Sequence, residues 1–239
     1  AALLAMRTRG RHVAGPGEPA AGEAESSWQR LTAGIRYARQ DCAVGMLILT
    51  AALTVLCGFP YMVLLPAIVS SALGLTGAEL SRRVAFVMAA NGLGAVAGAL
   101  LVASLPAHAR RDRIIPYSLA AVAVLLVGFA LMRWLPLLLV FSALAGGALL
   151  ASTSLVNTSM QVAAPRHLRG RIMALFVMAF MGQMPIASIV SGVLGQAVGP
   201  RNAVWILALP LLAWALLLIS RPGLLRPCPK SAGDTPAAG

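Results

Sequence analysis

The side chains that could do chemistry inside the apolar stretches of this chain are hydroxyls and amides. These groups donate and accept hydrogen bonds but do not ionise near neutral pH, so they suit the binding of a small molecule better than catalysis. The candidates for a substrate pathway are Thr50, Thr54, Asn91, Ser152, Thr153, Asn157, Gln183 and Ser188.

No Asp, Glu, Lys, Arg or His occurs within these stretches. Hydrolysis inside a membrane needs a nucleophile with a base, paired carboxylates or metal ligands. Cys42, Cys57 and Cys228 have no CxxC spacing that would indicate a disulfide or zinc site. The sequence therefore predicts a protein that is not an enzyme and has no cofactor, and it places no proton relay in this part of the molecule.

The amides are the most demanding of the polar groups, because hydrocarbon cannot satisfy their hydrogen bonds. Asn91, Asn157 and Gln183 are therefore expected to face other helices or a wet cavity. Two interpretations stay open for each of them: a structural bond between helices, or a role in a substrate path.

Six long apolar stretches carry these residues. Each is near the roughly 20 residues that a helix needs to cross a bilayer, and each is continuously apolar where a membrane strand would alternate. With 59% hydrophobic and only 11% charged residues, the chain is predicted to be an all-α membrane protein. The stretches are 43–69, 84–105, 114–132, 137–160, 172–198 and 203–219.

The third and sixth stretches are almost free of polar side chains, whereas the other four contain the hydroxyls and amides. We expect the third and sixth helices to face lipid and the other four to form an inner set. A peripheral helix at every third position is typical of two three-helix units, so the predicted architecture is six helices in two inverted three-helix repeats (3+3).

Basic residues cluster at alternate ends of the spans. The formal charge is +12, and of 19 Lys and Arg residues all but Arg82, Arg83, Arg133 and Arg201 fall on one side of the membrane. The positive-inside rule then places both termini in the cytoplasm. The predicted location is the inner or plasma membrane of the cell, as a multi-pass protein. The basic residues are expected to contact the lipid bilayer, and no nucleic-acid partner is predicted.

Small residues and prolines mark expected points of helix packing or bending. Gly94 and Gly98 lie four residues apart on one helix face, which allows a second backbone to approach closely. Prolines soften a helix where a gate could bend. The remaining candidates for packing or hinge positions are Pro60, Pro66, Pro185 and Gly192.

The rest of the chain divides by composition. An apolar run that ends in arginines suggests the last turns of a preceding membrane helix, so we expect this chain to be a C-terminal portion of something longer. A Gly- and Pro-rich linker follows, and then an amphipathic helix on the membrane surface or an extension of the first span. The predicted segments are 1–12 (helix end), 13–27 (linker), 28–40 (amphipathic helix), 41–220 (six-helix unit) and 221–239 (disordered cytoplasmic tail).

Several short motifs occur along the chain in the same order as in a known family. They resemble the C-terminal half of a major facilitator superfamily (MFS) transporter, in the branch that contains the enterobactin exporter and related drug-efflux permeases. The motifs are Gly58-Phe59-Pro60-Tyr61 with Leu64-Leu65-Pro66, Asn91-Gly92-Leu93-Gly94-Ala95 with Gly98-Ala99-Leu100, Pro165-Arg166-His167-Leu168-Arg169-Gly170-Arg171-Ile172-Met173, and Gly192 through Gly199-Pro200-Arg201.

The resemblance implies a twelve-helix transporter in two six-helix halves, which works by alternating access and of which this chain is the second half. It implies a cytoplasmic latch in which Asp112 meets Arg110, Arg111 or Arg113, while Arg169, Gly170 and Arg171 contact helix ends or simply set topology. The expected partners are a missing N-terminal half or a second six-helix unit, and a small amphipathic substrate. The alternative is a membrane scaffold or accessory permease subunit that does not transport.

Overall fold

The computed structural model describes residues 42–106, 110–164, 169–221 and 223–224, and within these ranges every regular element is a helix. Six helical spans are long and apolar enough to cross a membrane, which confirms the predicted number and the all-α class. The helices are α2 (Cys42–Leu53), η2 (Thr54–Gly58), α3 (Pro60–Leu73), α4 (Gly77–Ala103), α5 (Arg111–Leu131), α6 (Leu135–Ala163), α7 (Arg169–Met181), α8 (Met184–Val198) and α9 (Pro200–Ser220).

Several helices extend beyond the apolar stretches that predicted them. The clearest case is α4, which begins at Gly77 and not near position 84. Its extra turns are charged, and Glu79 pairs with Arg82 at 2.5 Å and with Arg83 at 2.8 Å. Ion pairs three and four residues apart support a helix in water, so hydropathy alone misses a turn that projects from the bilayer.

The first and fifth spans are each interrupted. In the first, α2 runs into the π-helical turn η2, and Phe59 separates that turn from α3. Pro60 begins α3, because proline fits a helix start but cannot donate a hydrogen bond to the turn before it. In the fifth, Gly182 and Gln183 separate α7 from α8. The rings of Phe59 and Phe180 meet edge to face at 5.7 Å, so the two interruptions lie side by side.

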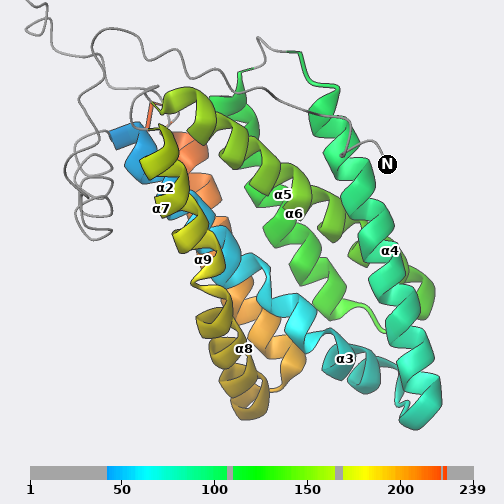
Figure 1. Cartoon of the computed structure of the whole chain (residues 1–239). Helices are drawn as coiled ribbons and strands as arrows, with labels where there is room; N and C mark the ends of the chain where they lie inside the picture. Colours follow the sequence, from blue (N-terminus) through cyan, green and yellow to red (C-terminus); the bar gives the residue numbers. More distant parts are fainter. Residues whose placement is uncertain (1–41, 107–109, 165–168, 222, 225–239) are drawn as a thin grey trace, which may run out of the picture.

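The spans pair reciprocally. The second span (α4) packs on the fourth (α6), the fifth (α7 and α8) packs on the first (α2 and α3), and the two third spans of the units (α5 and α9) pack on each other. This is the pattern that a pseudo-twofold relation between two three-helix units produces. In Figure 1, α4 stands at one edge of the bundle and α7 with α8 at the other.

The closest approach in the bundle joins α4 to α6. A Cβ atom built on Gly94 would lie 1.8 Å from the carbonyl oxygen of Ala143, and one built on Gly98 would lie 2.2 Å from that of Gly147. Only glycine allows the two backbones to come this near. We call this contact the glycine seam, defined by Gly94 and Gly98 of α4 against Ala143 and Gly147 of α6.

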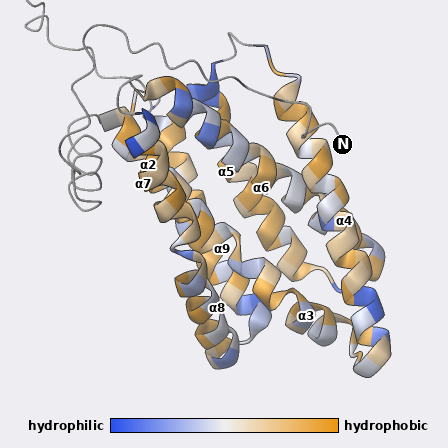
Figure 2. Cartoon of the chain, in the orientation of Figure 1, coloured by the Kyte–Doolittle hydropathy of each residue, from blue (hydrophilic) through white to orange (hydrophobic). Residues whose placement is uncertain are grey.

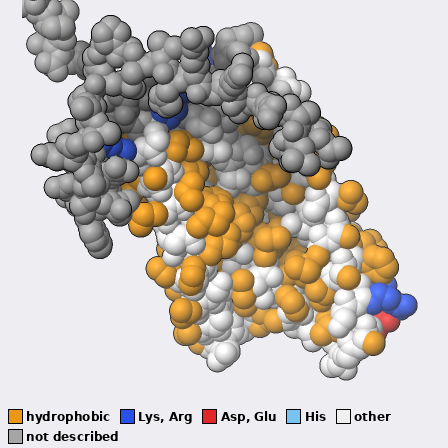
Figure 3. Space-filling model, in the orientation of Figure 1, with side chains coloured by type: hydrophobic (Ala, Val, Ile, Leu, Met, Phe, Trp, Pro, Cys, Tyr) orange, Lys and Arg blue, Asp and Glu red, His pale blue; other side chains and the backbone are white. Residues whose placement is uncertain are grey.

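Burial is lowest in the second and fifth spans. Only 17% of the most apolar window of each is buried, against 39% to 56% for the other four spans. The third and sixth spans are more buried than these two because α5 and α9 pack on each other. The expectation that the third and sixth spans face lipid stays a prediction. Hydrophobic side chains lie across the middle of the visible surface, and hydrophilic residues gather toward the helix ends (Figures 2 and 3).

The predicted segments 1–12, 13–27 and 28–40 lie outside the described residues, as do positions 165–168 of the arginine-rich loop and nearly all of the tail at 221–239. These expectations stay predictions.

Candidate functional site

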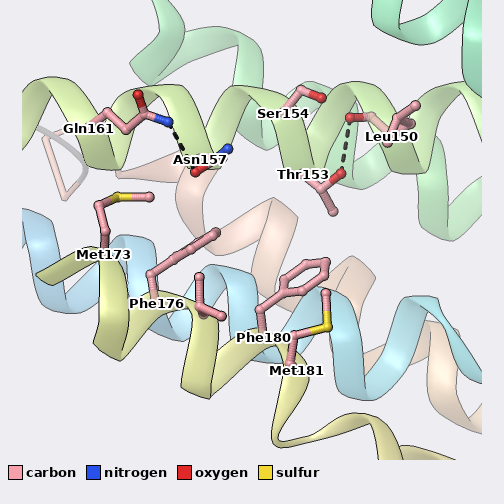
Figure 4. A pocket seen from close by; sticks show the side chains of 10 residues that line it. Leu150, Thr153, Ser154, Asn157, Gln161, Met173, Phe176, Phe180 and Met181 are labelled. Carbon is pink, nitrogen blue, oxygen red and sulfur yellow. Dashed lines mark hydrogen bonds between the residues drawn. The ribbon is translucent and has the colours of Figure 1, made fainter. Parts of the chain in front are cut away.

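A cavity of about 400 Å³ opens between α6 and α7 (Figure 4). Its two walls differ in chemistry: α6 presents hydroxyls and amides, and α7 presents aromatic rings and methionines. The lining residues are Leu150, Thr153, Ser154, Asn157 and Gln161 from α6, and Met173, Phe176, Val177, Phe180 and Met181 from α7.

The polar wall follows from helical spacing. Its residues recur every three or four positions, so they share one face of α6. Gln161 donates from Nε2 to the Asn157 Oδ1 at 3.4 Å, and Thr153 Oγ1 donates to the carbonyl oxygens of Leu149 or Leu150 at 3.0 Å. Among the described residues no hydrogen bond uses the Asn157 amide nitrogen, which leaves a donor for a ligand in the cavity.

The apolar wall is held by aromatic packing. Phe176 and Phe180 stack with their centroids 6.0 Å apart, and Phe59, at the interruption of the first span, packs its ring edge to face with that of Phe180. Figure 4 shows both rings of α7 directed toward the polar face of α6. Stacked rings offer a flat surface to another aromatic group and a negative face to a cation.

The cavity combines the features of a small-molecule site. Its volume falls in the usual range of about 300 to 1,000 Å³, with a mostly apolar lining and a few polar groups on one side. Such an arrangement can hold a molecule that has both an apolar body and a hydrogen-bonding group. Every side chain that lines the cavity is uncharged.

The structure divides the predicted pathway residues. Only Thr153 and Asn157 line the cavity. Ser152 is fully buried on the opposite side of α6, and its hydroxyl bonds the Ala148 carbonyl. Gln183 precedes α8 at the interruption of the fifth span, and Ser188 is exposed on α8 with its hydroxyl bonded to the Met184 carbonyl.

Thr50 of α2 and Thr54 of η2 are buried beside α9. The Thr54 hydroxyl donates to the Thr50 carbonyl at 2.7 Å, and Trp214 of α9 donates from Nε1 to the Thr50 hydroxyl oxygen at 3.2 Å. Both threonines are 1% exposed or less. Their polar groups are therefore used in helix packing and do not reach the α6–α7 cavity.

Asn91 joins three spans. Its Nδ2 donates both to the Tyr61 hydroxyl of α3 and, at 3.1 Å, to the Ser142 carbonyl of α6. Because a carbonyl can only accept, the second bond fixes the orientation of the amide. Asn91 is 5% exposed, and a Cβ on Gly146 would lie 2.6 Å from its Nδ2. The geometry favours the structural interpretation of this amide over a place in the substrate path.

Asn91→Ala is expected to lower the stability of the fold by about 1 to 2 kcal/mol, because both the Ser142 carbonyl and the Tyr61 hydroxyl lose a partner inside the bundle. For a chain of this size the melting temperature should fall by roughly 2 to 8 °C. Thermal unfolding in detergent measures the change. Asn202→Ala is the control, since that exposed amide bonds only the Val198 carbonyl; an equal fall in both variants would refute the structural role.

The residues expected to form a cytoplasmic gate lie at two helix starts. Arg110 precedes α5, whose first turn contains Arg111, Asp112 and Arg113. Asp112 and Arg113 line a small hollow of about 210 Å³ with Tyr117 and the end of α9. Arg169, Gly170 and Arg171 begin α7. The latch between Asp112 and an arginine stays a prediction.

The predicted packing and hinge positions fall into two groups. Gly94 and Gly98 form the glycine seam, and Pro60 and Pro185 lie at the starts of α3 and α8, beside the two interruptions. Pro66 lies inside α3 without ending it. Gly192 is different, because no described atom outside its own helix turn lies within 4 Å of a Cβ built there.

Sequence reasoning missed most of the cavity. Ser154, Gln161, Phe176 and Phe180 were not among the candidates, although the positions 153, 154, 157 and 161 share a helix face and 173, 176, 177 and 180 share another. Matching the polar stripe of one span to an aromatic stripe of the next would have found them.

Comparison with known proteins places the chain in a wider context. The family model described as "transmembrane secretion effector" matches residues 9–226. The multidrug efflux pump Tap of Mycolicibacterium fortuitum is 28% identical over 139 residues, which cover 58% of this chain and 34% of that relative. The match thus spans about a third of the length of the curated relative. No solved structure matches the chain significantly.

Proposed function

This chain belongs to the transmembrane secretion effector family of major facilitator transporters, and on that premise we propose that it binds and helps to export small amphipathic molecules. The observation that carries the proposal is the two-sided cavity between α6 and α7. An amphipathic molecule can place its apolar part against Phe176 and Phe180 while Asn157 or Gln161 bonds its polar group.

A second six-helix unit completes the permease in this proposal. The second and fifth spans have the least buried surface, and the exposed side of α4 includes Phe86, Leu93 and Leu100. A partner unit that packs on these two spans leaves the α6–α7 cavity between the halves. Motion of the two units against each other then exposes the cavity to each side of the membrane in turn.

The distribution of charge supports an orientation in the cell's inner or plasma membrane in which the starts of α5 and α7 face the cytoplasm. These helix starts contain Arg111 and Arg113, and Arg169 and Arg171. The opposite end holds Arg82, Arg83, Arg133 and Arg201, and there Glu79 pairs with both Arg82 and Arg83, which offsets part of that charge.

A scaffold without transport activity is the competing function. It requires the polar groups of the spans to be used up in packing, as those of Thr50, Thr54 and Asn91 are. The face formed by Thr153, Ser154, Asn157 and Gln161 instead borders open space, which favours a binding function.

Binding of rhodamine 6G, an amphipathic aromatic cation, to the purified chain in detergent tests the proposal. Phe176→Ala should weaken binding about tenfold or more, because it removes a stacking surface and a cation–π partner. Asn157→Leu, which nearly preserves volume, should weaken it roughly three- to tenfold if the amide bonds the dye. Fluorescence anisotropy gives the dissociation constants.

Phe86→Ala is the matched aromatic control, since that ring is half exposed on α4 and does not line the cavity. Ser188→Ala is the polar control for the same reason. If the control variants lose as much dye affinity as the cavity variants, the α6–α7 cavity is not the binding site.

A further inference from the structure

Four arginines stand at the end of the bundle where α3 ends and α4 begins, opposite the arginine-rich starts of α5 and α7. Two of them, Arg82 and Arg83, share the carboxylate of Glu79 at 2.5 and 2.8 Å. The other two, Arg133 between α5 and α6 and Arg201 in the first turn of α9, form no ion pair with any carboxylate of the described residues.

Arg201 is held beside Arg133. Its Nη2 donates to the carbonyl oxygen of Met132 at 3.0 Å, and Met132 directly precedes Arg133. This bond brings the Arg201 guanidinium to the peptide unit that joins Met132 to Arg133. The Nε of Arg201 is buried and has no acceptor among the described atoms. Neither Arg133 nor Arg201 has a carboxylate partner among the described residues, and an anion with several oxygens could bond both guanidinium groups at once.

Two tryptophans flank the arginine pair. Trp134 follows Arg133 and is 74% exposed, and Trp205 lies one turn after Arg201 and is 36% exposed. Exposed tryptophans at helix ends of a membrane protein lie at the level of the lipid headgroups, where the ring is half in hydrocarbon and half in water. The pair Arg133 and Arg201 is thus placed at the depth of the lipid phosphates.

We propose that Arg133 and Arg201 bind the phosphate of an anionic phospholipid in the leaflet opposite the arginine-rich loops, with Trp134 and Trp205 against its glycerol and upper acyl region. Arginine suits this ligand because its planar donors match the oxygens of a phosphate. The inference depends only on the membrane-spanning fold and the positions of these four residues. It is independent of the substrate and of transport.

Native mass spectrometry of the 239-residue chain in detergent, titrated with phosphatidylglycerol, tests the site. Arg133→Gln and Arg201→Gln should each weaken phosphatidylglycerol binding at least fivefold. Arg133 makes no hydrogen bond in the described structure that its replacement would break, so Arg133→Gln keeps the test valid if Arg201→Gln fails to fold. Arg82→Gln is the matched control at the same end of the bundle and should change binding less than twofold.

Two further titrants separate the sources of the phosphate. Diacylglycerol lacks the phosphate, and its retention should be the same in all variants. Glycerol 3-phosphate lacks the acyl chains and should bind at least tenfold more weakly than the lipid. The proposal would be overturned if Arg82→Gln lost as much affinity for phosphatidylglycerol as the Arg133 and Arg201 variants. It would also be overturned if neither Arg133→Gln nor Arg201→Gln lost affinity, or if glycerol 3-phosphate bound as tightly as the lipid.

Discussion

Replacing Gly94 with alanine is expected to destabilise the chain by about 3 kcal/mol or more, which corresponds to a fall in melting temperature of roughly 6 to 12 °C. The new Cβ would lie 1.8 Å from the Ala143 carbonyl oxygen, where no rotation of a side chain can relieve the clash. The backbones of α4 and α6 must separate by about 1 Å or more, which also stretches the bond from Asn91 to the Ser142 carbonyl one turn away.

Gly92→Ala is the matched control. Gly92 lies on the same helix two residues earlier, and no atom outside its local turn lies within 4 Å of a Cβ built there. Because alanine favours a helix over glycine, this variant should be neutral or slightly stabilising. Thermal unfolding of both variants in the same detergent measures the difference. Equal melting temperatures would show that the glycine seam does not limit the approach of α4 to α6.

Monomeric chain reconstituted alone into vesicles is expected to transport no rhodamine 6G above the leak of protein-free vesicles, even where it binds the dye. Alternating access requires two six-helix units that move against each other, and here the second and fifth spans are only 17% buried over their most apolar windows. On the proposed function, a single unit has a binding face without the opposing wall that would close it off from one side of the membrane.

The dye movement is followed by fluorescence quenching, with protein-free vesicles as the baseline. Light scattering in detergent establishes whether the reconstituted chain is a monomer. Transport by a preparation that is monomeric would contradict the requirement for a second unit, whereas dye binding without transport is the expected pair of results.

The six spans were predictable, because continuous apolar stretches and short arginine-bearing loops leave few alternatives in a membrane. The transporter family followed from the resemblance of several motifs, not from the apolar stretches. The ends of α4 were less predictable, since Glu79, Arg82 and Arg83 form a solvated helical turn that hydropathy treats as a loop. The expectation that the third and sixth spans face lipid stays a prediction, because the second and fifth spans, which are only 17% buried here, are the ones that a partner unit would cover. A polar residue in a span indicates that a partner exists, but it does not say whether that partner is in this chain.

For the same reason, the sequence could not show which candidate residues line the cavity. Thr54 and Asn91 find partners within the bundle, while Asn157 borders the cavity, and nothing in the residue types distinguishes these cases. Gln161 was missed because it falls one residue beyond the predicted end of its span. Phe176 and Phe180 were missed because aromatic rings in an apolar stretch look like lipid-facing residues until α6 is placed opposite them.

The three-way bond of Asn91 has a consequence for biosynthesis. Tyr61 precedes Asn91 by 30 residues, but Ser142 follows it by 51, so at a translation rate of about 5 to 20 residues per second the ribosome reaches Ser142 roughly 3 to 10 seconds later. During that interval α4 can pack on α3, but α6 is not yet present to bond the Asn91 amide or to pack on Gly94 and Gly98. The nascent chain therefore passes through a stage in which an amide in α4 still lacks one acceptor, and insertion of the fourth span ends that stage.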